Sequence, residues 1–226
     1  MEQKFFYLGV DLGQASDYTA LALLEKSFVI DPAPHSYKMV PSYSCTYLDR
    51  ARETSYPDIV DQIKTLLRNP KLADAKLVCD ETGVGRPVCD LMEEAGLHPV
   101  RVNITGGSQV REHDDGFAVP KRDLISALMI LFQSRALKIS SKLEHAATLA
   151  EELENFRVKT DIKTGHETYE HWREGQHDDL VLSLSLAAWY AECQDDRTSG
   201  LESRRPSPVR KDSYSPLTWK TKREKR

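Results

Sequence analysis

Short apolar runs alternate with amphipathic stretches along the chain, which is the pattern of an α/β protein. Residues 5–10 are almost unbroken apolar sequence, as expected for a strand covered on both faces, and residues 19–24 repeat this after a Gly-containing turn. Residues 39–47 alternate between polar and apolar, which predicts a half-exposed strand nearer an edge. Residues 77–80 and 100–104 predict the fourth and fifth strands.

Helical spacing of apolar residues fills the segments between and after these strands. It predicts five helices, over residues 59–67, 85–95, 121–137, 143–153 and 180–190. Residues 106–118 are polar and show no periodicity, which predicts a mobile loop, and residues 157–172 alternate as in a hairpin. The order predicts a mixed five-stranded sheet, with three antiparallel strands and then two parallel, helix-linked strands, flanked by helices.

The composition restricts the class of protein. At 226 residues and 40% apolar content, the chain suits one domain with a substantial core and a tail. It has no apolar stretch of about 18 residues and no signal peptide, so we expect no membrane contact and a cytoplasmic location. Its four cysteines are scattered, without a Cys-x-x-Cys pair, and are interpreted as reduced thiols: Cys45, Cys79, Cys89 and Cys193.

The net charge of −4 is unevenly distributed. Residues 195–226 hold 10 Lys or Arg against 5 Asp or Glu, and the rest of the chain holds 21 basic and 30 acidic residues. We therefore expect a folded domain over residues 1–193 and a basic, disordered tail over residues 194–226. The tail is interpreted either as a nucleic-acid arm or as a solvated terminus without a role.

Three acidic stretches lie beside predicted apolar elements, where burying a carboxylate costs free energy. Asp11 ends the first predicted strand, Asp80 ends the fourth, and Asp178-Asp179 precede the last helix. If the two strands are neighbours, both side chains reach one point above the sheet, and the helix adds a third carboxylate. Such acids repel one another, and a divalent metal is the common remedy. All-oxygen ligands favour Mg²⁺ or Mn²⁺, and two such ions can hydrolyse a phosphodiester.

Each acid also has a structural interpretation. Asp11 with Gly13 could shape a turn, Asp80 could cap the helix that follows it, and Asp178 could be the N-cap of the last helix. Any one of these is ordinary. All three acids in this order, on these elements, favour a metal site.

Asp178 and Asp179 compete for the third ligand position, because neighbours on a helix point about 100° apart. Asp179 shares a helical stripe with Leu182 and Leu186, so we favour Asp179, with Asp178 as the alternative. His177 is either a ligand, a residue that orients one, or a plain histidine before a helix. Glu81 follows Asp80 on a strand and is predicted to point to the opposite face.

The strand order, Gly9-Val10-Asp11-Leu12-Gly13, the turn after Asp80 and His177-Asp178-Asp179-Leu180-Val181 resemble the ribonuclease H-like superfamily. Within it they resemble the C-terminal nuclease domain of phage terminase large subunits, over residues 4–193. The resemblance implies endonucleolytic cutting of double-stranded DNA during genome packaging, with two divalent ions. It implies Asp11, Asp80 and Asp179 as ligands and residues 157–172 as a DNA guide. Lys121 and Arg122 are either phosphate contacts or ordinary surface charges.

One departure from that family concerns its motor. The Gly-x-x-x-x-Gly-Lys-Ser/Thr phosphate loop is not found in this sequence, so ATP-driven translocation is not expected of it. The chain is interpreted as an isolated nuclease domain, a split-off subunit or a different use of the fold. Expected partners are double-stranded DNA, a separate ATPase motor, a portal and a small terminase protein, in the host cytoplasm if a phage or prophage encodes it.

Three alternatives remain open at this point. A Holliday-junction resolvase or transposase-type nuclease would use the same acidic triad but prefer branched DNA. Asp11-Leu12-Gly13 followed by Thr19 also resembles the phosphate-binding hairpin of the actin and sugar-kinase superfamily, which needs a second such domain. A non-catalytic DNA-binding module would have no reason to keep three mutually repelling carboxylates.

Overall fold

A computed structural model describes residues 3–13, 17–33, 35–160, 167–171 and 177–194, with only the backbone described for 156–160 and 167–171. The chain divides into two compact units, Met1–Glu192 and Cys193–Arg226. The predicted basic tail therefore lies almost wholly outside the described residues. In the described ranges, no helix has the length and apolar character needed to cross a membrane.

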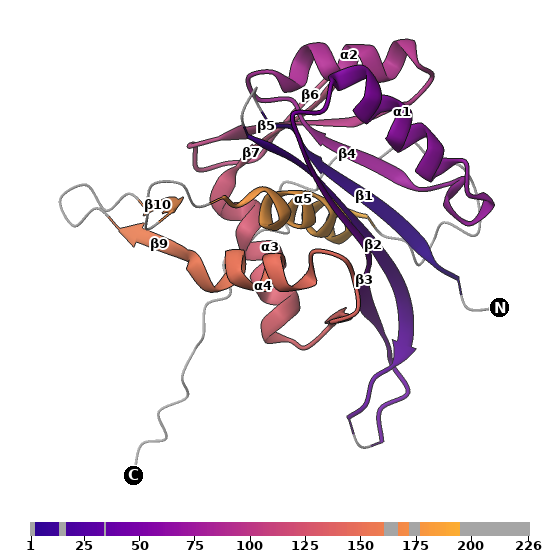
Figure 1. The fold of residues 1–226 in the computed structure, drawn as a ribbon. Helices are drawn as coiled ribbons and strands as arrows, with labels where there is room; N and C mark the ends of the chain where they lie inside the picture. The colour runs from indigo at the N-terminus through magenta and orange to yellow at the C-terminus, as the bar shows by residue number, and fades with distance from the viewer. Residues whose placement is uncertain (1–2, 14–16, 34, 161–166, 172–176, 195–226) are drawn as a thin grey trace. The chain divides into compact units, whose positions relative to one another are not determined.

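The first unit is built on a mixed sheet of eight strands in the order β6-β7-β5-β4-β1-β2-β3-β8 (Figure 1). β1, β2 and β3 pair antiparallel, whereas β4 is parallel to both β1 and β5. The predicted α/β fold class is confirmed, and so is the predicted arrangement of three antiparallel strands followed by two parallel strands. The strands are β1 Phe5–Asp11, β2 Tyr18–Ile30, β3 Met39–Arg52, β4 Lys76–Asp80, β5 Val100–Thr105, β6 Arg111–His113, β7 Gly116–Pro120 and β8 Leu137–Ile139.

The predicted number of five strands is too small. The mobile loop predicted for residues 106–118 is wrong, because β6 and β7 form there and β7 runs parallel to β5. β8, of which only Leu137 had been predicted to be helical, pairs parallel with β3. β6 and β8 have three residues each, too few to show a period, and β6 is fully exposed.

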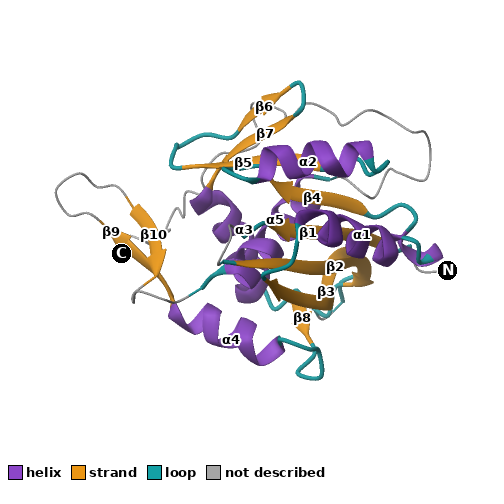
Figure 2. Cartoon of the chain, turned by 45° about the horizontal axis from the view of Figure 1, so that its top comes forward, coloured by secondary structure: helices purple, strands orange, loops and turns teal. Residues whose placement is uncertain are grey.

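Helices cover both faces of the sheet (Figure 2). α1 and α2 supply apolar side chains to one face, and α3, α4 and α5 supply them to the other. Outside the sheet, β9 and β10 pair antiparallel over the segment 157–172 that was predicted to be a hairpin, and residues 161–166 lie outside the described residues. The elements are α1 Tyr56–Leu67, the short 3₁₀ helix η1 Pro70–Leu72, α2 Gly85–Glu94, α3 Lys121–Gln133, α4 Ala146–Asn155, α5 Asp179–Cys193, β9 Phe156–Thr160 and β10 Glu167–His171.

β1 alternates between the two cores. Leu8 and Val10 pack on the side of α1 and α2, whereas Tyr7 packs on the side of α5. Since successive strand side chains point to opposite faces, Asp11 shares the α5 side with Tyr7 and Gly9. The strand therefore sends its terminal carboxylate toward the helix that begins at Asp179.

α5 lies directly on β1. A Cβ atom at Gly9 would lie 1.8 Å from the carbonyl oxygen of Ser183, so only glycine allows this approach. Every residue of the helix from Asp179 to Ala191 is buried, which fits its almost entirely apolar sequence. The contact fixes how deep Asp179, one turn before Ser183, sits beside the sheet.

Charged side chains bind both ends of α5. At its start, Glu152 of α4 accepts the backbone N–H groups of Leu180 and Val181 at 3.0 and 3.1 Å. At its end, the buried Lys26 Nζ donates to the carbonyl of Ala191 at 2.6 Å. A negative group at the N-terminus and a positive group at the C-terminus complement the helix dipole.

Candidate active site

Asp11 and Asp80 leave the sheet together. Val10 and Cys79 are paired between the parallel strands β1 and β4, and each acid follows one residue later on its own strand. Asp80 shares the face of Val78, which packs in the core on the α5 side. The two predicted strand-end carboxylates therefore lie at the same end and on the same face of the sheet.

A cavity of about 400 Å³ opens at this end of the sheet. All five of the predicted acidic and histidine candidates line it, together with residues of two loops. The lining residues are Asp11, Leu12, Gly13, Asp17, Asp80, Thr82, Gly83, His177, Asp178 and Asp179.

Asp11 is the acid whose charge is least compensated. It is 8% exposed, and none of the described residues forms a hydrogen bond or ion pair with its carboxylate. Burial raises the pKa of Asp11 well above its ordinary value, and the charges of Asp80, Asp179 and Asp178 raise it further, against a lowering by Lys121. A buried carboxylate in this state is stabilised by a cation.

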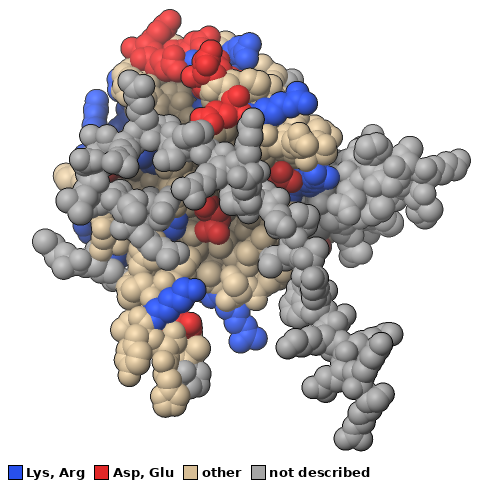
Figure 3. Space-filling model, turned by 180° about the vertical axis from the view of Figure 1, so that it is seen from behind, with Lys and Arg blue, Asp and Glu red and all other residues tan. Residues whose placement is uncertain are grey.

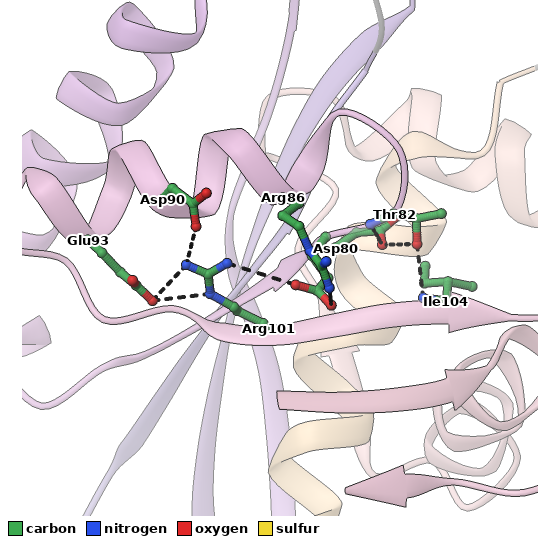
Figure 4. A network of polar contacts seen from close by, with 8 residues as sticks. Asp80, Thr82, Arg86, Asp90, Glu93, Arg101 and Ile104 are labelled. Carbon is green, nitrogen blue, oxygen red and sulfur yellow. Dashed lines mark hydrogen bonds and ion pairs between the residues drawn. The ribbon is translucent and has the colours of Figure 1, made fainter. Parts of the chain in front are cut away.

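Asp80 is held in place by the turn that follows it (Figure 4). Its Oδ1 accepts Thr82 N–H at 2.8 Å and Thr82 Oγ1–H at 2.6 Å, while the same hydroxyl accepts Ile104 N–H from β5 at 2.9 Å. Burial raises the pKa of Asp80, and the Thr82 hydrogen bonds oppose this. The N-cap of α2 is Val84, without a capping side chain, so the helix-cap interpretation of Asp80 is wrong.

Asp178 and Asp179 both face charged partners. Asp178 Oδ2 lies 2.8 Å from Lys121 Nζ, and Asp179 Oδ2 lies 3.0 Å from Arg50 Nη2. The Asp178 carbonyl accepts Leu182 N–H, so Asp178 stands at the N-cap position of α5. Burial raises the pKa of Asp179, whereas Arg50 lowers it. The geometry brings both acids to the cavity, and the choice between them as ligand stays a prediction.

The carboxylates do not already form a metal-binding group. Among the residues with described side chains, no three His, Cys, Asp or Glu residues are placed so that they could hold a metal ion. Arg50 and Lys121 instead engage Asp179 and Asp178. The donor set fits Mg²⁺ or Mn²⁺ chemically, because it is all oxygen and carries excess negative charge, but binding requires the carboxylates to move or exchange partners.

The remaining predicted residues lie close by. His177 Nδ1 is 3.7 Å from Asp179 Oδ2, and its ring meets the Tyr18 ring edge-on at 5.0 Å between centroids. Lys121 is engaged with Asp178, and Arg122 donates to the Ser108 carbonyl at 2.7 Å. A phosphate-binding role for either cation stays a prediction.

Two residues at this site, the half-buried Arg50 and the buried Glu152, were not expected from the sequence. Arg50 was missed because β3 was predicted to end at residue 47, whereas it continues to Arg52. Glu152 was missed because the side of the helix that faces the core is not the one predicted for residues 143–153. Leu149 and Glu152 are buried, whereas Ala147 and Ala150, which were predicted to be buried, are exposed. Neither residue has a local sequence signal.

The opposite face of the sheet carries a different charge cluster. Arg101 of β5 pairs with Asp90 at 2.7 Å, Glu93 at 2.9 Å and Glu81 at 3.9 Å, all on the α2 side (Figure 4). Glu81 thus points away from Asp80, as predicted. A cavity of about 640 Å³ beyond it is lined largely by acids, including Glu112, Asp114 and Asp115. Acidic side chains also gather at the end of the molecule near α2 and β6 (Figure 3), a surface that repels phosphate.

Two sequence relatives of the chain are large terminase subunits of phages. No family model matches the chain. The large terminase subunits of Thermus phage G20c and of Thermus virus P23-45 are each 23% identical to it over 205 residues. These matches cover 91% of this chain but 36% of each relative, so the chain spans about a third of their length.

A solved structure shows the same fold. The crystal structure of the large terminase nuclease of phage G20c matches with a TM-score of 0.57 and 21% identity, covering 82% of this chain and 81% of that one. The Mn-bound nuclease domain of the bacteriophage SPP1 large terminase matches with a TM-score of 0.48 and 15% identity, too low to establish a shared fold. The resemblance to phage terminase nuclease domains is therefore confirmed, and this chain has the fold of a large terminase nuclease.

Proposed function

We propose that this chain is a divalent-metal-dependent endonuclease that cuts double-stranded DNA during phage genome packaging. The observation that carries the proposal is Asp11, a buried carboxylate without a partner among the described residues, in a cavity with four further aspartates. Arg50 contacts Asp179 and Glu152, and Lys121 contacts Asp178. A divalent cation would offset the remaining charge.

In the proposed mechanism, Asp11, Asp80 and Asp179 hold the metal, with Asp178 as an alternative to Asp179. Two Mg²⁺ or Mn²⁺ ions bound there would activate a water and stabilise the leaving oxygen of the phosphodiester. Thr82 keeps Asp80 in one orientation through two hydrogen bonds to a single oxygen. Lys121, whose Nζ lies 2.8 Å from Asp178 Oδ2, would exchange this carboxylate for a DNA phosphate.

The wider assignment rests on the relatives. From the similarity to large terminase subunits, we propose that the nuclease works with an ATPase motor, a portal and a small terminase protein in the host cytoplasm. We assign the nuclease to residues 1–193 and a contribution to DNA affinity to the basic residues 194–226. Binding of DNA through such a tail would weaken with salt.

Cleavage of supercoiled plasmid tests the proposal. We expect cutting with Mn²⁺ or Mg²⁺, none with EDTA, and loss of cutting in Asp80→Ala with an unchanged circular dichroism spectrum. Asp17→Ala is the matched control, because it removes an exposed carboxylate from the rim of the same cavity and should leave cutting intact. Full activity of Asp80→Ala would refute the assignment. Preference for a four-way junction over linear duplex would favour a resolvase.

A further inference from the structure

Arg50 reaches the acidic cavity across a row of three strands. Asp11 of β1 pairs with Ala20 of β2, and Ala20 pairs with Arg50 of β3. All three side chains share the face toward α5, and the small Ala20 leaves room above the middle strand. The long Arg50 side chain can therefore extend from β3 toward the start of α5.

The Arg50 guanidinium is enclosed by one aromatic ring and two acids. Its carbon lies 3.8 Å from the centroid of the Tyr18 ring, and Nη2 lies 3.0 Å from Asp179 Oδ2 and 3.6 Å from Glu152 Oε1. The Arg50 side chain is 12% exposed. Stacking on an aromatic face and contact with two carboxylates fix a planar guanidinium in one orientation.

Glu152 links Arg50 to the backbone of α5. Its Oε2 accepts the N–H groups of Leu180 and Val181, the two residues after Asp179, while its Oε1 faces Arg50 and has no hydrogen bond. The same carboxylate therefore anchors both the helix start and the guanidinium. Asp179 is held from two directions, through its own backbone and through its Oδ2.

The contacts of Asp179 use only one of its oxygens. Arg50 and His177 both approach Oδ2, at 3.0 and 3.7 Å, and no donor for Oδ1 is found in the described part of the chain. A metal ligand whose second oxygen is hydrogen-bonded is oriented by that bond, and such supporting bonds strengthen metal affinity.

We propose that Arg50 and Glu152 are positioning residues that orient Asp179 so that Oδ1 is available to a divalent cation. This inference rests on the proposed function. It distinguishes Arg50 from a cation that merely occupies the place of the metal, since an occupying cation would compete with binding. An orienting guanidinium supports binding, and a single ammonium at the same place supports it less, because it lacks the planar group that stacks on the Tyr18 ring.

Calorimetric titration of the full chain with Mn²⁺ alone, without DNA, tests the proposal. In Arg50→Met we expect the Kd for Mn²⁺ to rise about 10- to 100-fold, the range for loss of a bond to a metal ligand. Arg50→Lys should recover part of this, and Glu152→Gln should weaken binding while its amide oxygen still accepts the α5 N–H groups. Arg86→Met is the matched control, because Arg86 is exposed and contacts Glu81 on the other face, so its Kd should not change.

An unchanged or tighter Kd in Arg50→Met overturns the proposal, and a tighter one identifies Arg50 as a competing cation. Circular dichroism shows whether each variant is folded. If Arg50→Met does not fold, Arg50→Lys decides: affinity equal to the wild type overturns the proposal, and weaker affinity supports it.

Asp80→Ala separates failure of the proposed function from failure of the inference about Arg50. If neither the wild type nor Asp80→Ala binds Mn²⁺, the proposed function and this inference both fail; if only the wild type binds, the Arg50 variants test this inference alone.

Discussion

Both faces of the sheet carry clusters of charged side chains at the end of β4, but the acids of the two clusters differ in how far their charge is neutralised by cationic side chains. On the α2 side, Glu81, whose side chain is 9% exposed, lies near the buried Arg101, and the other acids of that cluster, Asp90 and Glu93, are half exposed to water. On the α5 side, Asp11, Asp178 and Asp179 are each at most 9% exposed, and Asp11 has no partner among the described residues.

This difference separates a structural cluster from a candidate functional one. A buried charge with a counter-charge needs nothing further, and breaking the pair destabilises the fold. A buried carboxylate without one costs stability that a bound cation can restore. Neighbouring residues, Asp80 and Glu81, take part in these opposite arrangements because successive side chains of a strand point to opposite faces.

The largest expected effect is that of Asp11→Asn. Loss of a metal ligand should lower plasmid cleavage by at least about 1,000-fold, equivalent to about 4 kcal/mol in the barrier. In EDTA the same variant should be more stable than the wild type, because the uncompensated charge is gone. Cleavage rates and thermal unfolding measure the two effects. Asp90→Asn is the control, because it removes a half-exposed acid on the other face; it should neither lower the cleavage rate nor raise the thermal stability in EDTA. If Asp11→Asn is less stable than the wild type in EDTA, the charge of Asp11 is not uncompensated.

Arg101→Met should show the reverse pattern. It removes the buried cation near Glu81 Oε2 and leaves only the exposed Arg86, at 3.5 Å from Oε1, as a described counter-charge for this acid. We therefore expect the free energy of unfolding in urea to fall by about 1 to 3 kcal/mol. Mn²⁺ affinity should stay at the wild-type value, because the cluster lies on the α2 side. Adding Glu81→Gln should recover part of the lost stability. If Mn²⁺ binding also weakened, the two faces would not be independent.

The smallest effect is the pH dependence that Glu152 contributes. Burial raises the pKa of Glu152 from 4.5 to about 7, so the folded protein binds this proton more tightly than the unfolded chain. Its contribution to stability is therefore largest below pH 4.5 and is lost as the pH rises through about 7. In EDTA we expect a loss on the order of 1 kcal/mol from about pH 5.5 to about pH 7.5. The slope should be shallower in Glu152→Gln, and an equal slope would assign the titration to another group.

The sequence predicts the parts of the fold that have strong local patterns. Apolar runs identify β1, β2, β4 and β5, and their order is enough for the antiparallel and parallel pairings that the structure confirms. Asp11 and Asp80 follow directly, because each ends such a run. The positions of these acids could be predicted, whereas their role as ligands stays a prediction.

The contacts that surround those acids have no local pattern. Arg50 and Glu152 meet because β3 and α4 are brought to the same place by the whole fold, across about a hundred residues of sequence. The pairing of Lys121 with Asp178 likewise joins the starts of α3 and α5. Short elements such as β6 and β8 fail for another reason, since three residues cannot define a period.

The contact between Gly9 and Ser183 makes the spacing of the site insensitive to change in the surrounding core. Main-chain atoms, which every amino acid possesses, set the distance between the strand that carries Asp11 and the helix that carries Asp179. Apolar side chains elsewhere can then be exchanged over evolutionary time while the two acids keep their separation. Position 9 is the exception, because any side chain there would lift the helix off the strand.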